Sequence, residues 1–175
     1  TGSPSGKSVE FIDTQNGDYS SMTRSTHDEW EKVAFEWAQK ADDINGHLEC
    51  VFIGPEGEAG SIAFSPETQQ GRVVLTTTGN GVSDMGQWNA GTWYTVRVEL
   101  DTGADRYSKV YLQGNLVATD VAFRTAMSSI TGVMFRTGTG TSSPEGASRY
   151  IDNFREYALT NQTDQTVIVP PDGDA

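Results

Sequence analysis

Residues 91–114, GTWYTVRVELDTGADRYSKVYLQG, have the pattern of two strands joined by a turn. Successive side chains of a strand point to opposite faces. In the first strand the largely apolar Tyr94, Val96, Val98 and Leu100 share one face. The opposite face of the two strands carries aromatic and basic side chains: Trp93, Arg97, Tyr107, Lys109 and Tyr111. The pattern therefore predicts a hairpin with one core face and one outer face suited to binding.

The length of the turn predicts which residues face each other. If residues 101–105 form the loop, Leu100 lies opposite Arg106, and Arg97 lies opposite Lys109. Like charges at opposed positions destabilise a sheet. The chain has 24 acidic and only 12 basic residues, so two adjacent bases indicate a functional reason.

Short stretches of alternating apolar and polar residues continue along the chain. Turn-forming clusters of Gly, Asn, Asp and Pro separate them. Strands are expected at 8–13, 32–40, 47–54, 60–65, 72–78, 93–100, 107–114, 132–138 and 150–159. This spacing predicts an all-β fold, an antiparallel two-sheet β-sandwich of the jelly-roll type. Residues 25–32, STHDEWEK, have a weak helical pattern, with a loop or the start of a strand as the alternative.

The chain of 175 residues has the length of one domain. We expect the sandwich at 8–159, between an N-terminal linker at 1–7 and a C-terminal segment at 160–175. That last segment reads as a linker, or as one added edge strand through TVIV. The absence of an initial Met suggests a mature or excised module, so its location must be inferred from its function.

Charge and cysteine content exclude several classes of function. A net charge of −12 and a pI near 4.4 argue against nucleic acid and anionic membranes as partners. No apolar run approaches the roughly 20 residues that a membrane helix needs. The single cysteine, Cys50, lies in the apolar stretch HLECVFIG, which predicts a buried residue. Thiol catalysis would need His27 or His47 beside it.

The hairpin and the segments after it resemble a known group of domains. Trp93, Tyr94, Val96 and Asp101, the return strand at 107–114, and IDNF at 151–154 resemble concanavalin-A-like or laminin-G-like jelly-roll modules of secreted polysaccharide-acting proteins. The resemblance is clear over 88–159. It implies a non-catalytic carbohydrate-binding module, secreted and monomeric within a multi-modular polysaccharide-degrading protein.

Enzymatic and structural alternatives stay open. Hydrolases of this fold use two carboxylates, commonly presented on a strand as Glu-x-Asp-x-x-Glu, and that motif is absent from the sequence. The nearest acidic set is Glu29, Glu31 and Glu36. A polysaccharide lyase would use a Tyr or His base beside Arg, a role open to Tyr111 and Arg97. A structural or adhesion spacer would have its outer face covered by loops.

The expected ligand of the binding module is an acidic polysaccharide. Sugar rings present apolar faces to flat aromatic side chains, and carboxylates or sulfates pair with arginine. Arg136, in GVMFRTG, is expected to face the same way as Arg97 if Val133 and Phe135 are core residues. The predicted carbohydrate-binding residues are Trp93, Arg97, Tyr107, Lys109, Tyr111 and Arg136.

A calcium site is implied by the resemblance. In related jelly-roll modules an acid at the position of Asp152 helps to hold a structural Ca²⁺, with a second acid near the first strand. Here that second acid would be Asp13 or Glu10. Calcium prefers such oxygen ligands. The alternative is that Asp152 caps backbone groups in a turn.

Overall fold

The computed structural model describes residues 8–12, 20–44, 46–64, 69, 71–138 and 148–159, and the side chains of 27–29 are not among those described. The expected linkers at 1–7 and 160–175, and the candidate ligand Asp13, lie outside the described residues. Within the described part, no helix is long and apolar enough to span a membrane.

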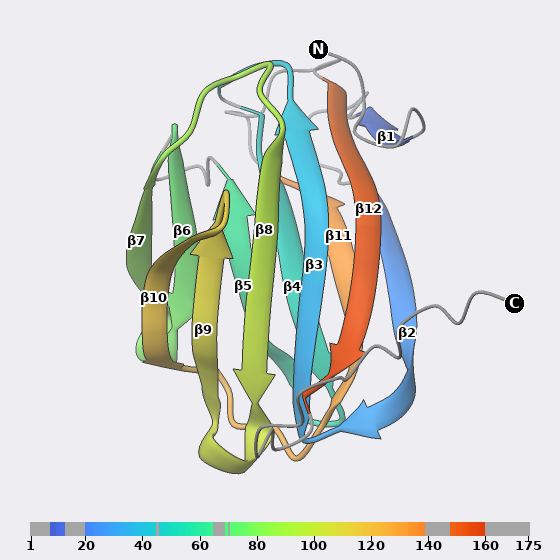
Figure 1. The fold of residues 1–175 in the computed structure, drawn as a ribbon, viewed down its shortest axis with the longest axis vertical. Helices are drawn as coiled ribbons and strands as arrows, with labels where there is room; N and C mark the ends of the chain where they lie inside the picture. The colour runs from blue at the N-terminus through green and yellow to red at the C-terminus, as the bar shows by residue number, and fades with distance from the viewer. Residues whose placement is uncertain are drawn as a thin grey trace, which may run out of the picture.

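Two six-stranded antiparallel sheets pack face to face as a sandwich (Figure 1). Sheet A has the order β1-β12-β3-β8-β9-β10, and sheet B has the order β2-β11-β4-β5-β6-β7. The chain crosses repeatedly between the two sheets, which is the jelly-roll arrangement that the sequence predicts. The strands are β1 Val9–Ile12, β2 Ser21–Trp30, β3 Lys32–Ala41, β4 Leu48–Gly54, β5 Gly57–Phe64, β6 Arg72–Thr77, β7 Gly81–Gln87, β8 Tyr94–Asp101, β9 Arg106–Leu112, β10 Asn115–Ala122, β11 Ile130–Thr137 and β12 Ser148–Ala158.

Each expected strand is present, and three further strands, β2, β7 and β10, were not expected. All three lie at the edges of their sheets. An edge strand buries less of its surface, so its sequence shows little apolar alternation. Residues 25–30, for which a helical turn was one expectation, are extended within β2, where Ser25 and Trp30 pair with β11 on either side of a register shift.

The core lies between the sheets and is rich in aromatic side chains. Phe35 stacks on Phe52 with ring centroids 5.9 Å apart, and Trp37 meets Phe135 edge-on at 5.6 Å. Cys50 belongs to this core, and burial raises the pKa of its thiol well above the ordinary value. Thiol chemistry is therefore disfavoured, as the sequence predicts.

The loop of the β8–β9 hairpin is one residue shorter than expected. Asp101 pairs with Arg106, and Asp101 Oδ1 accepts a hydrogen bond from the backbone N–H of Ala104 at 3.2 Å. Asp105 completes the turn in a left-handed conformation, with φ 50°. Because the loop is one residue shorter, Tyr107 takes the place expected for Arg106 and lies opposite Leu100, on the core side.

A β-bulge at Ser108 restores the expected alternation further along β9. Beyond it Glu99 pairs with Lys109, and Arg97 pairs with Tyr111. The expected pairing of Arg97 with Lys109 is therefore wrong. The expected position of Tyr107 on the outer face is also wrong, because this side chain is 0% exposed and packs in the core.

Candidate functional site

The outer face of sheet A brings charged and aromatic side chains from four strands together. Arg97 on β8 pairs with Glu36 on β3 and with Tyr111 on β9, and Glu36 pairs with Arg155 on β12. The next row along the strands contains Tyr157, Ala34, Glu99 and Lys109. We refer to one set of side chains as the Arg97 cluster: Glu36, Arg97, Glu99, Lys109, Tyr111, Arg155 and Tyr157.

Arg97 is held from one side only. Its Nε and Nη2 donate to Glu99 Oε1 at 3.2 and 2.9 Å. Its guanidinium carbon lies 6.0 Å from the ring centroid of Tyr111 and 5.8 Å from that of Tyr157, within the range of cation–π attraction. Its Nη1 makes no hydrogen bond to any described residue, and its side chain is 38% exposed. Arg97 therefore keeps donor capacity toward solvent.

Glu99 separates the two basic residues of the hairpin. Its Oε2 lies 3.9 Å from Lys109 Nζ, while its Oε1 accepts from Arg97, and its side chain is only 12% exposed. The register shift inserts this carboxylate between the two cations. The expected repulsion between Arg97 and Lys109 is replaced by a shared acidic partner.

Glu36 and Arg155 extend the cluster toward β12. The hydrogen-bonding and charge interactions with Tyr157, and after them the charge of Glu36, raise the pKa of Arg155. Three basic residues, with Lys109 the third, thus share this face with the two carboxylates of Glu36 and Glu99. The local balance is basic in a chain whose net charge is −12.

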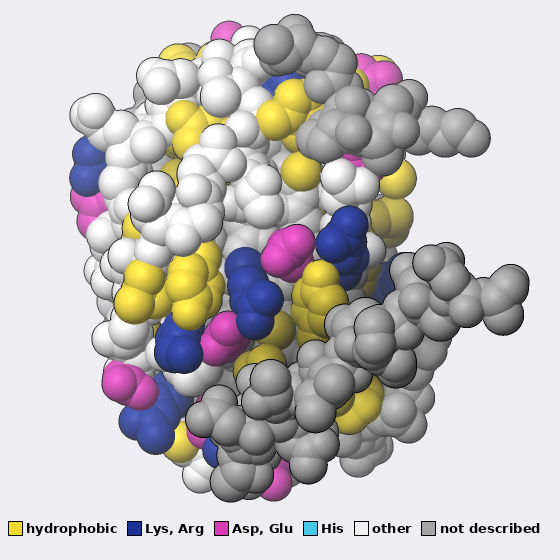
Figure 2. Space-filling model, viewed as in Figure 1, with side chains coloured by type: hydrophobic (Ala, Val, Ile, Leu, Met, Phe, Trp, Pro, Cys, Tyr) yellow, Lys and Arg dark blue, Asp and Glu magenta, His cyan; other side chains and the backbone are white. Residues whose placement is uncertain are grey.

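A hollow of about 340 Å³ lies within the cluster. Its lining combines carboxylates, a guanidinium, a phenol and a hydroxyl: Glu36, Thr95, Arg97, Glu99, Tyr111 and Gly114. Figure 2 shows basic, acidic and hydrophobic side chains gathered across the middle of this face. A structural spacer would have this face covered, yet the side chain of Lys109 remains 51% exposed. The hollow offers both donors and acceptors to a hydroxylated or anionic ligand.

Trp93 lies on the same face, but outside the Arg97 cluster. It is partly exposed, and its ring centroid is 6.3 Å from that of Tyr150. Lys40 Nζ lies 4.4 Å from the Tyr150 ring centroid. Trp93 therefore forms a separate aromatic group near the start of β8.

Arg136 lies on the other sheet, so the expectation that it extends the basic stripe is wrong. It belongs to β11 and donates from Nε to Glu49 at 2.7 Å and from Nη1 to Glu58 at 2.8 Å. Burial acts to lower the pKa of Arg136, but the two glutamates outweigh it and raise the pKa. His47 Nε2 also lies in this region, 4.0 Å from Glu49.

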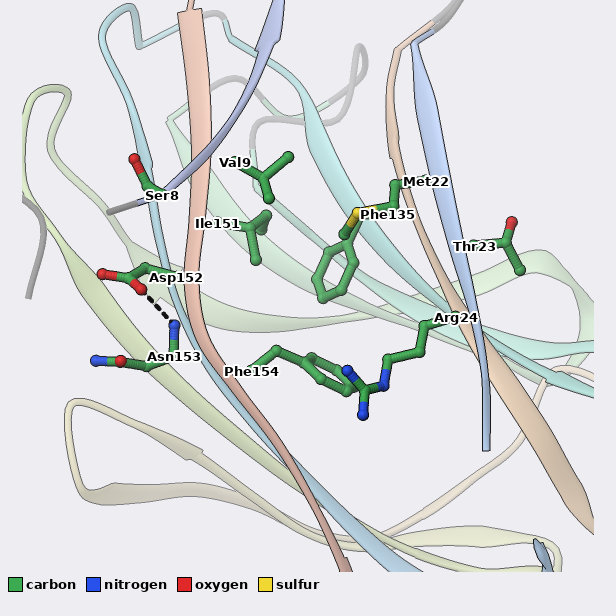
Figure 3. Close-up of a pocket in the computed structure, with 10 residues that line it drawn as sticks. All are labelled: Ser8, Val9, Met22, Thr23, Arg24, Phe135, Ile151, Asp152, Asn153 and Phe154. Carbon is green, nitrogen blue, oxygen red and sulfur yellow. Dashed lines mark hydrogen bonds between the residues drawn. The ribbon is translucent and has the colours of Figure 1, made fainter. Parts of the chain in front are cut away.

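A larger cleft, about 610 Å³, opens where β2 and β11 face β12 and β1 (Figure 3). Its lining is mostly apolar, and Arg24 lies over the Phe154 ring at 5.1 Å. Asp152 lies at one end of the cleft, where its Oδ1 accepts from the backbone N–H of Asn153 at 2.7 Å. The described residues contain no group of three or more His, Cys, Asp or Glu side chains that fits a metal ion.

The fold defines a class of protein, the jelly-roll β-sandwich domains, and the outer face of sheet A is open and polar. Residues 3–150 match the family described as "Sialidase-like, CBM domain". The match covers more than half of the chain, and the protein belongs to this family of carbohydrate-binding modules. No curated protein shows a significant match to the chain.

Solved structures with the same fold come from proteins with diverse printed names. A sialidase is similar with a TM-score of 0.76 and 19% identity, over 87% of this chain and 15% of the sialidase chain. The alginate lyase AlgAT5 of polysaccharide lyase family 7 has a TM-score of 0.57 and 18% identity, covering 89% of this chain and 80% of its own. A galectin from the ball sponge Cinachyrella sp. has a TM-score of 0.59 and 14% identity, covering 79% and 99%. At these identities the likeness establishes the fold alone.

Proposed function

We propose that the Arg97 cluster binds an acidic polysaccharide. One observation carries the proposal: a half-exposed guanidinium that lies beside two tyrosine rings and keeps a donor edge toward a hollow. A guanidinium pairs well with the carboxylate or sulfate of a sugar, because its planar donors match two oxygens at once. Tyr111 and Tyr157 add flat apolar surface at little cost in conformational entropy.

The two glutamates of the cluster serve a different part of the ligand. Glu36 lines the hollow, and its carboxylate accepts hydrogen bonds from neutral sugar hydroxyls. Glu99 is mostly occupied by Arg97 and Lys109, so it positions these cations rather than contacting the ligand. Lys109, at 51% exposure, adds a flexible point charge at the rim.

Affinity electrophoresis tests this function directly. The purified protein is run at low salt through gels containing alginate, pectate, ulvan or carrageenan, with a neutral glucan as control. We expect retardation by at least one acidic polymer, and Arg97→Met should reduce it strongly. Arg106→Met is the matched control, because Arg106 lies at the loop end of the same hairpin and pairs with Asp120 at 3.1 Å. Migration unaffected by every acidic polymer would disprove the proposal.

We also propose that the module acts outside the cell, as part of a larger polysaccharide-degrading protein. The matched region occupies only 15% of the sialidase chain, which supports a modular arrangement. An acidic protein also stays soluble where salt screens its surface charges. Immunodetection of the parent protein in the culture medium and in cell extract tests the location, and recovery from the extract alone would contradict it.

Lyase activity is the second candidate, because Arg97 and Tyr111 are cross-strand neighbours beside the hollow. In such a reaction arginine would neutralise the uronate and tyrosine would move a proton. The product of elimination is an unsaturated uronate, which absorbs in the ultraviolet. Incubation with the acidic polymers should show no rise in this absorbance if the module only binds. A steady rise that Tyr111→Phe abolishes would instead establish a lyase.

A structural calcium ion remains a proposal based on the resemblance of Asp152 to a ligand position. Asp152 supplies one carboxylate, which already accepts from Asn153, and the second acid, Asp13, lies outside the described residues. If both bind Ca²⁺, excess chelator should lower the melting temperature and added Ca²⁺ should restore it. Asp152→Asn should abolish that response. A melting temperature that chelator leaves unchanged would remove the calcium proposal.

A further inference from the structure

A second group of aromatic and basic side chains lies on the same outer face, two rows from Arg97. Lys40 on β3 pairs with Tyr150 on β12. On the other side of β3, Tyr94 pairs with Gln39. Trp93, the residue before Tyr94, therefore lies beside Lys40. The contacts Trp93–Tyr150 and Lys40–Tyr150 show that these three side chains form one row, from the residue before β8 across β3 to β12. This row is the Trp93 group.

Small side chains form the floor between the Trp93 group and the Arg97 cluster. Thr95 pairs with Ala38, and this pair lies in the row between Trp93 and Arg97. Ala38 is 4% exposed, so it does not rise above its neighbours, and Thr95 presents only a hydroxyl and a methyl group. The hollow beside Arg97 already extends to Thr95. The floor over β8 and β3 is therefore low and uncharged, while Asp152, the partner of Ala38 on β12, adds a carboxylate beside it. Figure 2 shows a largely uncharged band above the charged cluster.

We infer that this strip binds an oligosaccharide segment lying along the strands, from Tyr111 and Arg97 over Thr95 to Trp93. Four residues of an extended strand span about 13 Å, more than one sugar ring covers. The segment therefore contains several sugar residues in a row. This inference rests on the proposed function and deepens it, because it states that the module recognises a stretch of polymer instead of a single sugar.

The two ends of the strip differ in their chemistry. At the Arg97 end of the strip, Arg97 and Lys109 provide positive charge, and salt screens its attraction for an anionic ligand. At the Trp93 end, the side chain of Lys40 is 17% exposed and pairs with Asp42 at 2.7 Å, so the charge of Lys40 is already balanced. The Trp93 end thus acts through the partly exposed indole of Trp93. Salt does not screen the contact between this indole and a sugar ring.

A length series of oligosaccharides tests the inference. Disaccharides, tetrasaccharides and hexasaccharides from the polymer that retards the protein are titrated by calorimetry against the wild type, Trp93→Ala, Trp93→Phe and Arg97→Met. We expect wild-type affinity to rise from the disaccharide to the longer oligomers. Trp93→Ala should weaken binding of the hexasaccharide about tenfold and leave the disaccharide within about twofold. Trp93→Phe should restore most of the loss, because a flat ring remains.

Three results separate this inference from the proposed function. Disaccharide and hexasaccharide binding of equal strength, both dependent on Arg97, would overturn the strip and leave the Arg97 site intact. Equal loss for all lengths in Trp93→Ala, with an unchanged melting temperature, would also overturn it. If no oligomer and no acidic polymer binds the wild type, the proposed function itself fails.

Discussion

Arg97 and Arg136 lie on opposite outer faces of the sandwich, and both are held by glutamates. Arg136 engages Glu49 and Glu58 with all three of its nitrogens, and its side chain is 24% exposed. Arg97 engages Glu99 alone through two nitrogens, and it is 38% exposed. The first arginine has every side-chain nitrogen engaged within the protein, whereas the second keeps a donor edge beside two tyrosine rings.

The surroundings of Glu49 strengthen this difference. Glu49 also accepts a hydrogen bond from the Ser61 hydroxyl, and the backbone N–H of Ser61 donates to Thr76 Oγ1 at 2.7 Å. Beside this network Val51 is buried on the outer side of sheet B, outside the core cluster. The sheet B network is therefore closed and structural. An arginine is available to a ligand when its carboxylate partners are too few to satisfy it, so partner number matters more than exposure alone.

The largest expected effect is on stability. Arg136→Met removes the cation between two partly buried carboxylates, and we expect a loss of about 1–3 kcal/mol, less than for a fully buried pair because Arg136 is partly exposed. Arg97→Met leaves Lys109 near Glu99 and should cost under about 1 kcal/mol. Urea unfolding measures both losses as shifts in the midpoint of the transition, with the dependence of the unfolding free energy on urea concentration unchanged. Equal losses in the two variants would contradict the distinction between a structural and an available arginine.

A double-mutant cycle identifies the cause of the Arg136 effect. If the loss arises from unpaired charge, Glu49→Gln should partly rescue Arg136→Met, so the double variant should lose less than the sum of the single losses. Additive losses would show that the lost packing of the arginine side chain, and not its charge, is responsible. This cycle needs no ligand and does not depend on the binding proposal.

Ligand affinity should show the opposite order. At low salt Arg97→Met should weaken binding of the acidic polymer about tenfold, and the difference from wild type should shrink as salt rises, because the lost contact is electrostatic. Arg136→Met should stay within about twofold of wild type at every salt concentration. Calorimetry in buffers of low and high ionic strength measures both. A larger loss of affinity in Arg136→Met would place the binding site on sheet B.

Sequence reasoning predicted the two-sheet fold because apolar alternation marks every interior strand. It also predicted the outer positions of Arg97, Lys109 and Tyr111. It misplaced Tyr107 because the pattern of apolar residues does not show that the loop is one residue shorter. Nor does this pattern show the bulge that compensates for the shorter loop. Arg136 was misplaced for a different reason: alternation shows that a side chain faces outward, but not from which sheet.

The remaining members of the cluster depend on pairings between strands distant in the sequence. Glu36, Arg155 and Tyr157 lie on β3 and β12, and only the β3–β8 and β3–β12 registers bring them beside Arg97. The motif REY at 155–157 shows the alternation that places Arg155 and Tyr157 on one face. That pattern gives no information about which strand lies next to β12, so these residues were missed.

The smallest expected effect concerns acid stability at the edge of sheet B. Asp84 lies in the cross-strand row that begins at Arg136, and hydrogen bonds from Arg72 and then from the Gly86 N–H lower its pKa. A carboxyl whose pKa is lower in the folded state stabilises the protein above its unfolded pKa, near 4. This contribution is lost as the pH falls through the folded pKa. Wild type should therefore melt slightly above Asp84→Asn at pH 7, and the gap should close near pH 2.

The size of that gap sharpens the comparison between the two faces. Asp84 is well exposed, so solvent screens its pair with Arg72 and the difference in melting temperature should be small. The less exposed Glu49 should show a larger loss of melting temperature at pH 7 when replaced by Gln, because its pair with Arg136 is less screened by solvent. Differential scanning calorimetry of the two variants at pH 7 measures this order, and scans of Asp84→Asn at pH 2 test the closing of its gap. If Asp84→Asn has the greater effect, the strongest ionic contact of sheet B lies at its edge, and Arg136 is not the centre of a closed network.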